Sequence, residues 1–293
     1  MRISIIGAGV VGKATGVGLH KFGHEVIFYD IAREKLKALE EEGYRVSENL
    51  NAIRGFDIHM ICVPTHVLDN KMYLMPLESA VKELAKMMVR QNKYQVIVIR
   101  STILPLTTKT KIIPLLQRHC PLRLGEEYGI CHNPEFLREA HPLEDFLEPP
   151  IIVIGTDDMQ SANIMRELYI PFQSALLITT PENAEAIKYF SNVYNTTKIS
   201  FFNQVYIIAE RLGLDHEVIS QALTKSSLGV RIPEYYTKGG YPFRGRCLPK
   251  DLTAFIAFLE EQGFNPKLFL TVAEINEEMK RIEAKGKKEG RQG

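Results

Sequence analysis

A glycine pattern near the start of the chain constrains the fold more than any other feature. Gly7, Gly9 and Gly12 form the pattern G-x-G-x-x-G. The β-branched run Arg2–Ile6 precedes them, and a helical pattern follows to about Phe22. In a strand–turn–helix unit such glycines permit a tight turn, let the backbone approach a pyrophosphate and let helix and strand pack closely, while the helix N-terminus faces the phosphates. The pattern therefore predicts a dinucleotide-binding βαβ unit, with a glycine turn in an unrelated α/β fold as the alternative.

The end of the next predicted strand indicates which dinucleotide is bound. Asp30 closes the apolar run at residues 25–30, 18 residues after Gly12. A carboxylate at this point accepts hydrogen bonds from the adenosine ribose hydroxyls and repels a 2′-phosphate, so the sequence favours NAD over NADP. Arg33 and Lys35 follow closely and leave tolerance of that phosphate as the alternative.

The pattern of elements changes along the chain. Strand patterns at Arg2–Ile6 and at residues 25–30, 58–63, 94–99 and 151–155 are separated by segments long enough for helices, and 33–42 and 77–89 have helical spacing. After Thr180 the spacing is helical almost throughout, at about 181–211, 215–223, 252–261 and 268–284. This predicts the α/β class, with a Rossmann-type parallel sheet in an NAD-binding domain at 1–180 and a mainly helical central domain at 181–293.

Charge and apolar runs exclude several classes of partner. Lys plus Arg total 36 and Asp plus Glu total 35, so the net charge of +1 gives no basic field to attract nucleic acid. Apolar runs are short and interrupted, and the chain opens as a strand instead of a signal peptide, so we expect no membrane segment and a cytoplasmic location. The four cysteines lack metal-ligand spacing, so thiols and no metal site are expected.

One of these cysteines suggests chemistry. Cys247 lies between Arg246 and Lys250, cations that could lower its pKa, although an isolated cysteine is more often a small buried hydrophobe. Beside a nicotinamide, a thiolate can add to an aldehyde as a thiohemiacetal, lose hydride to become a thioester, and release an acid on hydrolysis. Cys62 and Cys131 are interpreted as core or backbone-supporting residues, and Cys120 has no suggestive neighbours.

Several ordered motifs together resemble the UDP-glucose/GDP-mannose dehydrogenase family of nucleotide-sugar 6-dehydrogenases. They are the glycine loop with Asp30, VPT at 63–65, RSTILP at 100–105, NPEFLRE at 133–139, ENAEAIK at 182–188 with Asn192, then Arg231, and CLPKD at 247–251. The resemblance implies an NAD-binding Rossmann domain, a helical central domain that forms a homodimer, a nucleotide-sugar substrate, and oxidation of its C6 alcohol to the uronic acid with two NAD per turnover. We expect the family's C-terminal nucleotide-binding domain to be absent, or supplied by a separate partner.

The resemblance also implies site residues. The expected catalytic residues are Cys247 as nucleophile, Lys188 and Asn192 for the oxyanion, Glu135 as general base, Thr102, and Asp251. The expected cofactor contacts are Gly7, Gly9, Val10, Val11, Gly12, Asp30, Lys35, Thr65, Thr102, Glu139 and Lys250. The expected substrate contacts are Glu135, Phe136, Leu137, Arg138, Glu139, Lys188, Asn192, Arg231 (toward the diphosphate bound by a neighbouring subunit) and Gly245.

The chain departs from the family pattern just before the cysteine. Arg244 and Arg246 stand where the family usually has Gly and Ser, and His66 stands where a second Pro is common. The two arginines could contact a phosphate or obstruct the pocket. Two other functions stay open: a Rossmann-plus-helical hydroxy-acid dehydrogenase with a single two-electron step, and a catalytically impaired short paralogue that binds NAD or a partner subunit.

Overall fold

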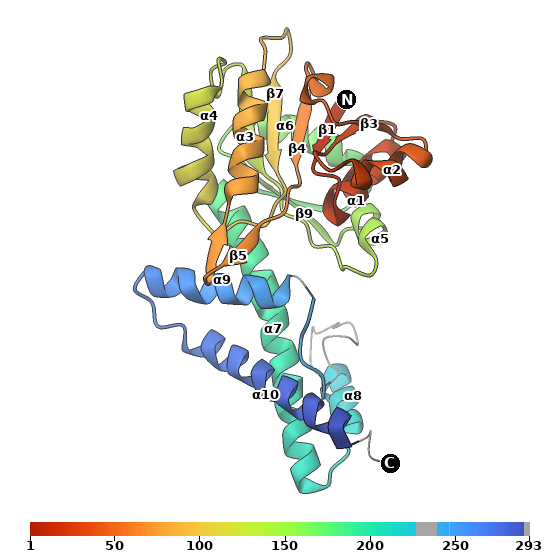
Figure 1. Cartoon of the computed structure of the whole chain (residues 1–293), viewed down its shortest axis with the longest axis vertical. Coiled ribbons are helices and arrows are strands. Elements are labelled where there is room, and N and C mark those ends of the chain that lie inside the picture. The colour runs from red at the N-terminus through yellow and green to blue at the C-terminus, as the bar shows by residue number, and fades with distance from the viewer. Residues whose placement is uncertain (227–238, 246, 290–293) are drawn as a thin grey trace. The chain divides into compact units, whose positions relative to one another are not determined.

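The computed structural model describes residues 1–226, 239–245 and 247–289 (Figure 1). The chain divides into two compact units. The sheet unit comprises Met1–His66 and Met72–Lys188, and the helical unit comprises Val67–Lys71 and Tyr189–Gly293. The division falls inside one long helix, whereas the sequence analysis places a domain boundary at 180/181; that boundary stays a prediction.

The sheet unit is built on a mostly parallel sheet, which confirms the predicted fold class. In the described residues its strand order is β10-β9-β8-β7-β4-β1-β2-β3, and the β8–β9 pairing is antiparallel. The strands are β1 (Arg2–Ile6), β2 (Glu25–Tyr29), β3 (Arg45–Ser47), β4 (Ile58–Ile61), β7 (Gln95–Ile99), β8 (Tyr128–His132), β9 (Ile151–Gly155) and β10 (Ala175–Thr179). β1 lies between β2 and β4, and the strand order reverses at this point. Ligands of such sheets bind there, beside the carboxyl ends of the strands.

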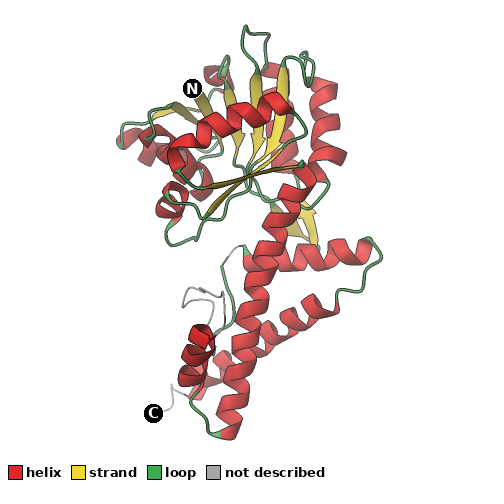
Figure 2. Ribbon diagram, turned by 180° about the vertical axis from the view of Figure 1, so that it is seen from behind, coloured by secondary structure: helices red, strands yellow, loops and turns green. Residues whose placement is uncertain are grey.

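Helices cover both faces of this sheet (Figures 1 and 2). They are α1 (Val10–Lys21), α2 (Arg33–Glu41), α3 (Met75–Met87), α4 (Ile113–His119), α5 (Pro142–Leu147) and α6 (Met159–Tyr169), with short turns η1 (Leu50–Ile53), η2 (Thr108–Ile112) and η3 (Ile170–Phe172). Side chains of β7 alternate between the two cores: Val96 and Val98 pack with α1, α2 and α6, and Ile97 and Ile99 pack with α3 and α4. A strand that is buried on both faces has a continuous apolar sequence, so β7 could be predicted from the sequence.

The helical unit is formed mainly by α7 (Pro181–Leu212), α8 (His216–Ser226), α9 (Leu248–Glu261) and α10 (Lys267–Glu289). The strands β5 (His66–Leu68) and β6 (Lys71–Tyr73) form a separate two-stranded sheet, of which residues Val67–Lys71 count with the helical unit. Phe255 of α9 is fully buried, and its ring lies 5.6 Å from that of Tyr189 on α7 and 5.5 Å from that of Phe269 on α10. Aromatic packing of this kind stabilises the three-helix contact.

The predicted helices are present, with shifted ends. α9 begins at Leu248, four residues before the predicted start, because Pro249 fits the first turn of a helix, where its missing N–H costs nothing. The sequence analysis does not single out β8 or β10. β8 contains Gly129, against which Ser161 of α6 packs so closely that a Cβ would lie 2.0 Å from its hydroxyl. Such a small residue weakens a strand pattern even though the strand is buried.

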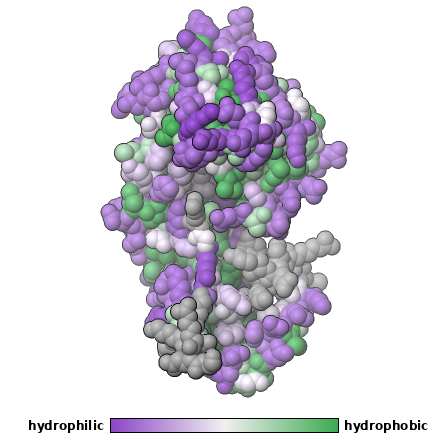
Figure 3. All heavy atoms as spheres, turned by 45° about the vertical axis from the view of Figure 1, so that its right-hand side comes forward, coloured by the Kyte–Doolittle hydropathy of each residue, from purple (hydrophilic) through white to green (hydrophobic). Residues whose placement is uncertain are grey.

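Hydrophilic side chains cover most of the sheet unit on the face that Figure 3 presents. Among the residues that the structure describes, no helix combines the length and the apolar character needed to cross a membrane. Within the same residues, no group of three or more His, Cys, Asp or Glu side chains is placed to hold a metal ion.

Candidate active site

The glycine loop joins β1 to α1 and leaves open space at Gly9. A Cβ on Gly12 would lie 1.8 Å from the carbonyl oxygen of Gly7, and Gly7 itself has φ +100° and lies against the backbone of Cys62. By contrast, a Cβ on Gly9 would meet nothing within 4 Å. Two glycines are therefore required for packing, and the third leaves open the place where a pyrophosphate would approach the N-terminus of α1.

Asp30 follows β2 and is tied into the same loop. Its carboxylate accepts the N–H of Ala8 (2.8 Å) and that of Ala32 (2.9 Å), and Lys35 Nζ lies 3.6 Å away. Each carboxylate oxygen retains acceptor capacity for a ribose hydroxyl. These residues fit the adenosine end of a dinucleotide, and the Lys35 side chain is directed to Asp30.

The carboxyl ends of β4 and β7 are joined by side-chain hydroxyls. Thr65 Oγ1 donates to the carbonyl of Thr102 (2.8 Å), and Ser101 Oγ donates to the carbonyl of Val63 (2.6 Å). The two predicted threonines therefore lie side by side, at the sheet edge where such folds bind nicotinamide cofactors.

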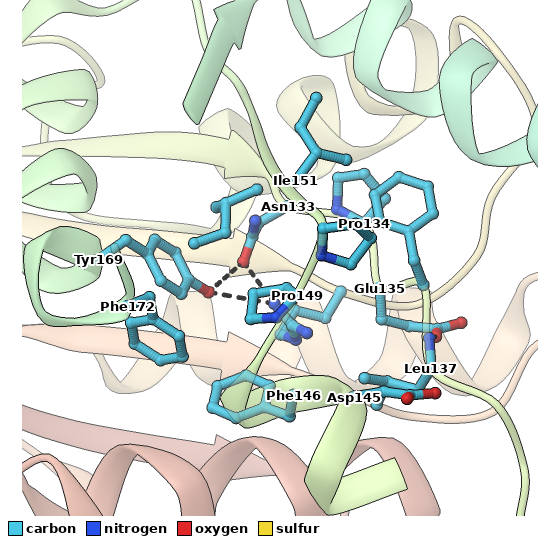
Figure 4. A pocket seen from close by; sticks show the side chains of 14 residues that line it. Asn133, Pro134, Glu135, Leu137, Asp145, Phe146, Pro149, Ile151, Tyr169 and Phe172 are labelled. Carbon is cyan, nitrogen blue, oxygen red and sulfur yellow. Dashed lines mark hydrogen bonds between the residues drawn. The ribbon is translucent and has the colours of Figure 1, made fainter. Parts of the chain in front are cut away.

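A buried arginine organises the next strand end, beside the pocket that Asn133 and Tyr169 line (Figure 4). Arg100 is 4% exposed, and its Nη1 donates to Asn133 Oδ1 and to the hydroxyl of Tyr169 (3.2 Å). Tyr169 donates to the same Asn133 oxygen (2.5 Å), and Asn133 Nδ2 donates to the carbonyl of Val153 (2.7 Å). Burial raises the pKa of Tyr169 to about 12, so this hydroxyl stays a donor. The cluster fixes the loop that follows β8, and a small pocket open to solvent lies beside it.

The loop that follows β8 places the Glu135 carboxylate beside the Lys188 ammonium. The carboxylate Oε1 and the ammonium Nζ are 2.8 Å apart, and both residues are more than nine-tenths buried. The second oxygen, Oε2, accepts the N–H of Leu137 (2.6 Å). Burial alone would raise the pKa of Glu135, but Lys188, the Leu137 N–H and Arg100 together hold it below its ordinary value. Glu135 is therefore ionised at neutral pH, and the ring of Phe136 shields the pair, with its centroid 5.7 Å from Nζ.

The helical unit assembles a second group of predicted residues. Cys247 is exposed and directly precedes α9, whose first-turn residue Asp251 donates its N–H to the Cys247 carbonyl (2.8 Å). The buried Asp251 carboxylate accepts Asn192 Nδ2 of α7 (2.6 Å) and pairs with Lys250 (2.7 Å). A thiolate at a helix N-terminus is stabilised by the helix dipole. Lys250, expected at the cofactor, is bonded to Asp251.

The loop before Cys247 is fastened to α10. The N–H of Phe243 donates to Asn276 Oδ1 (2.8 Å), and Asn276 Nδ2 donates to the Phe243 carbonyl (3.3 Å). Arg244 pairs with Glu283 of the same helix. Asn276 and Glu283 were not predicted as site residues. The helical spacing of Asn276 with Val272 and Met279 was the available signal for the first, and Glu283 had none.

The other predicted substrate residues make different contacts, are exposed, or fall beyond the described residues. Arg138 forms a bidentate pair with Asp145 (2.6 to 3.1 Å), and Glu139 is exposed. Arg231 and Arg246 fall outside the described residues, so their predicted contacts stay predictions.

The other cysteines differ from Cys247 in their surroundings. Cys62 and Cys131 are buried in the core, and this burial raises the pKa of their thiols to about 12. Cys120 is half-buried.

Two family models match nearly the whole chain. Residues 1–52 and 37–173 match the NAD binding domain of the UDP-glucose/GDP-mannose dehydrogenase family, and residues 182–278 match its central domain. The chain belongs to this family. NAD is the cofactor that the family's N-terminal domain takes, in agreement with Asp30 and the open glycine loop.

Named relatives within the family are identical to this chain at about a third of the aligned positions. A GDP-mannose 6-dehydrogenase of Pseudomonas putida is 34% identical over 276 residues, which are 87% of this chain and 63% of that protein. A UDP-glucose 6-dehydrogenase of Bacillus subtilis is 32% identical over 95% of this chain and 63% of its own length. The structure of a UDP-glucose dehydrogenase from Pyrobaculum islandicum is similar with a TM-score of 0.85 and 31% identity, covering 96% of this chain and 68% of that one. The chain thus spans less than two thirds of the length of these curated relatives.

Proposed function

We propose that this protein is an NAD-dependent nucleotide-sugar 6-dehydrogenase that oxidises the C6 alcohol of the sugar to the uronic acid through a covalent intermediate on Cys247. The observation that carries the proposal is the placement of this thiol: it is exposed at the start of α9, whereas Cys62 and Cys131 are buried with raised pKa values. The names of the relatives support the reaction class, since two of them are GDP-mannose and UDP-glucose 6-dehydrogenases.

The proposed reaction consumes two NAD and one water per uronic acid. Bound NAD accepts the hydride in each of the two oxidations. The first turns the alcohol into the aldehyde, with the hydroxyl proton passing to a base. The Cys247 thiolate then forms a C–S bond at C6, and the carbonyl electron pair moves to oxygen. Loss of the second hydride restores the C=O bond and gives a thioester, which water cleaves to the acid and the thiolate.

The polar residues of the chain have matching roles in this proposal. The Lys188 ammonium carries three N–H donors, so it can stabilise an oxyanion while Glu135 accepts one of them. The Asn192 amide, oriented by Asp251, would supply another donor. Ionised Glu135 would take a proton from the attacking water, and Thr102 would hold this water or the nicotinamide. The predicted substrate contacts of the 135–139 loop and Gly245 are part of the same proposal.

We further propose that the active form is a homodimer. Phe190, Tyr194 and Phe201 are each more than half exposed on α7, and their spacing places them on one face of the helix. A row of large exposed apolar residues is typical of an interface. The length difference from the relatives supports a requirement for a further nucleotide-binding domain, in this chain or as a separate partner.

The test is product stoichiometry with a panel of UDP-, GDP- and dTDP-sugars, with and without a supplied partner domain. We expect two NADH per uronic acid for the wild-type protein and no acid from Cys247→Ala. The matched control Cys120→Ala should keep full activity. NAD titration verifies that each variant is folded. Full conversion to acid by Cys247→Ala would exclude the thioester route. One NADH per substrate would favour the hydroxy-acid dehydrogenase, and NAD binding without turnover would favour the impaired paralogue.

A further inference from the structure

Glu185 is a buried carboxyl that the proposed reaction does not use. It lies one turn before Lys188 on α7 and has no exposed surface. Its Oε1 accepts the backbone N–H of Thr108 at 2.7 Å. Thr108 is the first residue of η2, which is a π-helix. Glu185 therefore fastens the start of η2 to α7 through a backbone hydrogen bond.

The segment that ends at this hydrogen bond is strained. It runs from Thr102 to Thr108, and within it Leu106 adopts φ +74°, a left-handed conformation that costs a side chain bearing a Cβ roughly 1 kcal/mol or more. It leads into a π-helix, a rare geometry found frequently at functional sites. The carbonyl of Thr102 accepts the hydroxyl of Thr65 at one end, and Glu185 binds Thr108 at the other. Thr65 and Glu185 thus restrain the two ends of a segment that contains a strained residue.

Two polar atoms at the Glu185 end have no partner. Among the residues that the structure describes, Oε2 of Glu185 and Oγ1 of Thr108 are buried without a hydrogen bond. A buried carboxylate with an unsatisfied oxygen is costly when charged, whereas the neutral acid is tolerated. Burial accordingly raises the pKa of Glu185 to about 7, against the opposing effect of the Thr108 backbone N–H, which donates to Oε1.

The neighbouring ionisable groups leave Glu185 as the one that titrates near neutrality. Glu182, one turn earlier on α7, raises the pKa of Glu185 and is itself paired with Lys109 of η2 (3.1 Å). Lys188, one turn later, is paired with Glu135. On the sheet, burial lowers the pKa of His132 to about 3, so this side chain stays neutral.

We propose that Glu185 is a positioning residue that holds the 102–108 segment through Thr108, and that ionisation of its carboxyl loosens this segment. Because the segment begins at Thr102, loosening it would move a residue that the proposed function places at the reacting atoms; this consequence rests on the proposed function. The proposed opening of the 102–108 segment does not depend on that function.

The sign and size of the effect follow from proton linkage. An opened segment exposes Glu185 to water, where its ordinary pKa is 4.5, while the closed segment holds it at about 7. Stability against opening is therefore fully present below pH 4.5 and is lost as the pH rises toward 7. Between pH 5 and pH 8 the opening equilibrium should rise roughly 70-fold.

Hydrogen exchange measured by mass spectrometry tests this without any substrate. Exchange of the peptide covering residues 102–112 is followed from pH 5 to pH 8, corrected for intrinsic rates, with the β8 peptide as internal reference. We expect the rise in the wild type, a flat profile in Glu185→Gln, and a wild-type profile in the control Glu40→Gln, which removes an exposed carboxylate of α2. A rise of equal size in Glu185→Gln, or a flat wild-type profile, would overturn the proposal. If Glu185→Gln does not fold, the wild-type profile relative to β8 decides alone. Failure of the dehydrogenase assay leaves this result untouched.

Discussion

Replacing Lys188 by methionine removes the cation beside Glu135 while keeping the length of the side chain. The Nζ–Oε1 distance of 2.8 Å and the burial of both residues mean that the remaining carboxylate would stay in an apolar site with one N–H donor, from Leu137. Breaking a buried ion pair on one side typically costs about 3–5 kcal/mol, because the other charge is left uncompensated. We expect Lys188→Met to lose about this much stability at pH 8.

The pH dependence gives a second, independent readout. In the wild type the pKa of Glu135 is held below its ordinary value of 4.5, so its contribution to stability is present above that pH and is lost as the pH falls through the lowered pKa. Without Lys188, burial would raise this pKa. The sign then reverses, and the variant should lose stability as the pH rises from 5 to 8.

Urea unfolding at pH 5 and pH 8 measures both effects. The control is Lys86→Met, which removes an exposed i,i+3 pair with Glu83 and should leave the free energy of unfolding nearly unchanged. Adding Glu135→Gln to Lys188→Met should recover much of the loss, since neither partner of the pair then carries a charge. A loss below about 1 kcal/mol that is equal at both pH values would refute the reasoning, because it would show that Glu135 reaches water or another cation.

Two further predictions concern the glycine loop and the loop before the cysteine. Gly12→Ala should unfold or strongly destabilise the protein, since its Cβ would lie 1.8 Å from the Gly7 carbonyl oxygen. Gly9→Val should keep the thermal midpoint and weaken NAD binding at least about tenfold in calorimetric titration. Equal stability of both variants would contradict the packing argument. Asn276→Leu removes both hydrogen bonds to Phe243 and should lower the free energy of unfolding by about 2 kcal/mol. The control is Lys280→Leu, an exposed position on α10. An unchanged midpoint for Asn276→Leu would show that other contacts hold the loop.

Local chemistry made much of the sheet unit predictable. The turn at Gly7 and the start of α1 depend on residues next to one another, so the sequence alone identifies them. β-branched runs identify β1 and β9, which the structure places at the predicted residues. By contrast β8, with Gly129 and His132, lacks such a run, and its burial results from packing by distant elements.

The sequence by itself determined the α/β class and the dinucleotide loop, and its resemblance to the family made Glu135, Lys188 and Cys247 candidate residues. Only the tertiary structure decided what these residues contact. On an isolated helix Lys188 would be a solvated cation; it is buried because a loop 53 positions earlier brings Glu135 to within 2.8 Å. The titration of Glu185 likewise depends on a distant backbone N–H and on the loss of water around it. Turn and helix preferences act over a few residues and can be read in order, whereas charge pairing and desolvation depend on which distant segments the fold brings together.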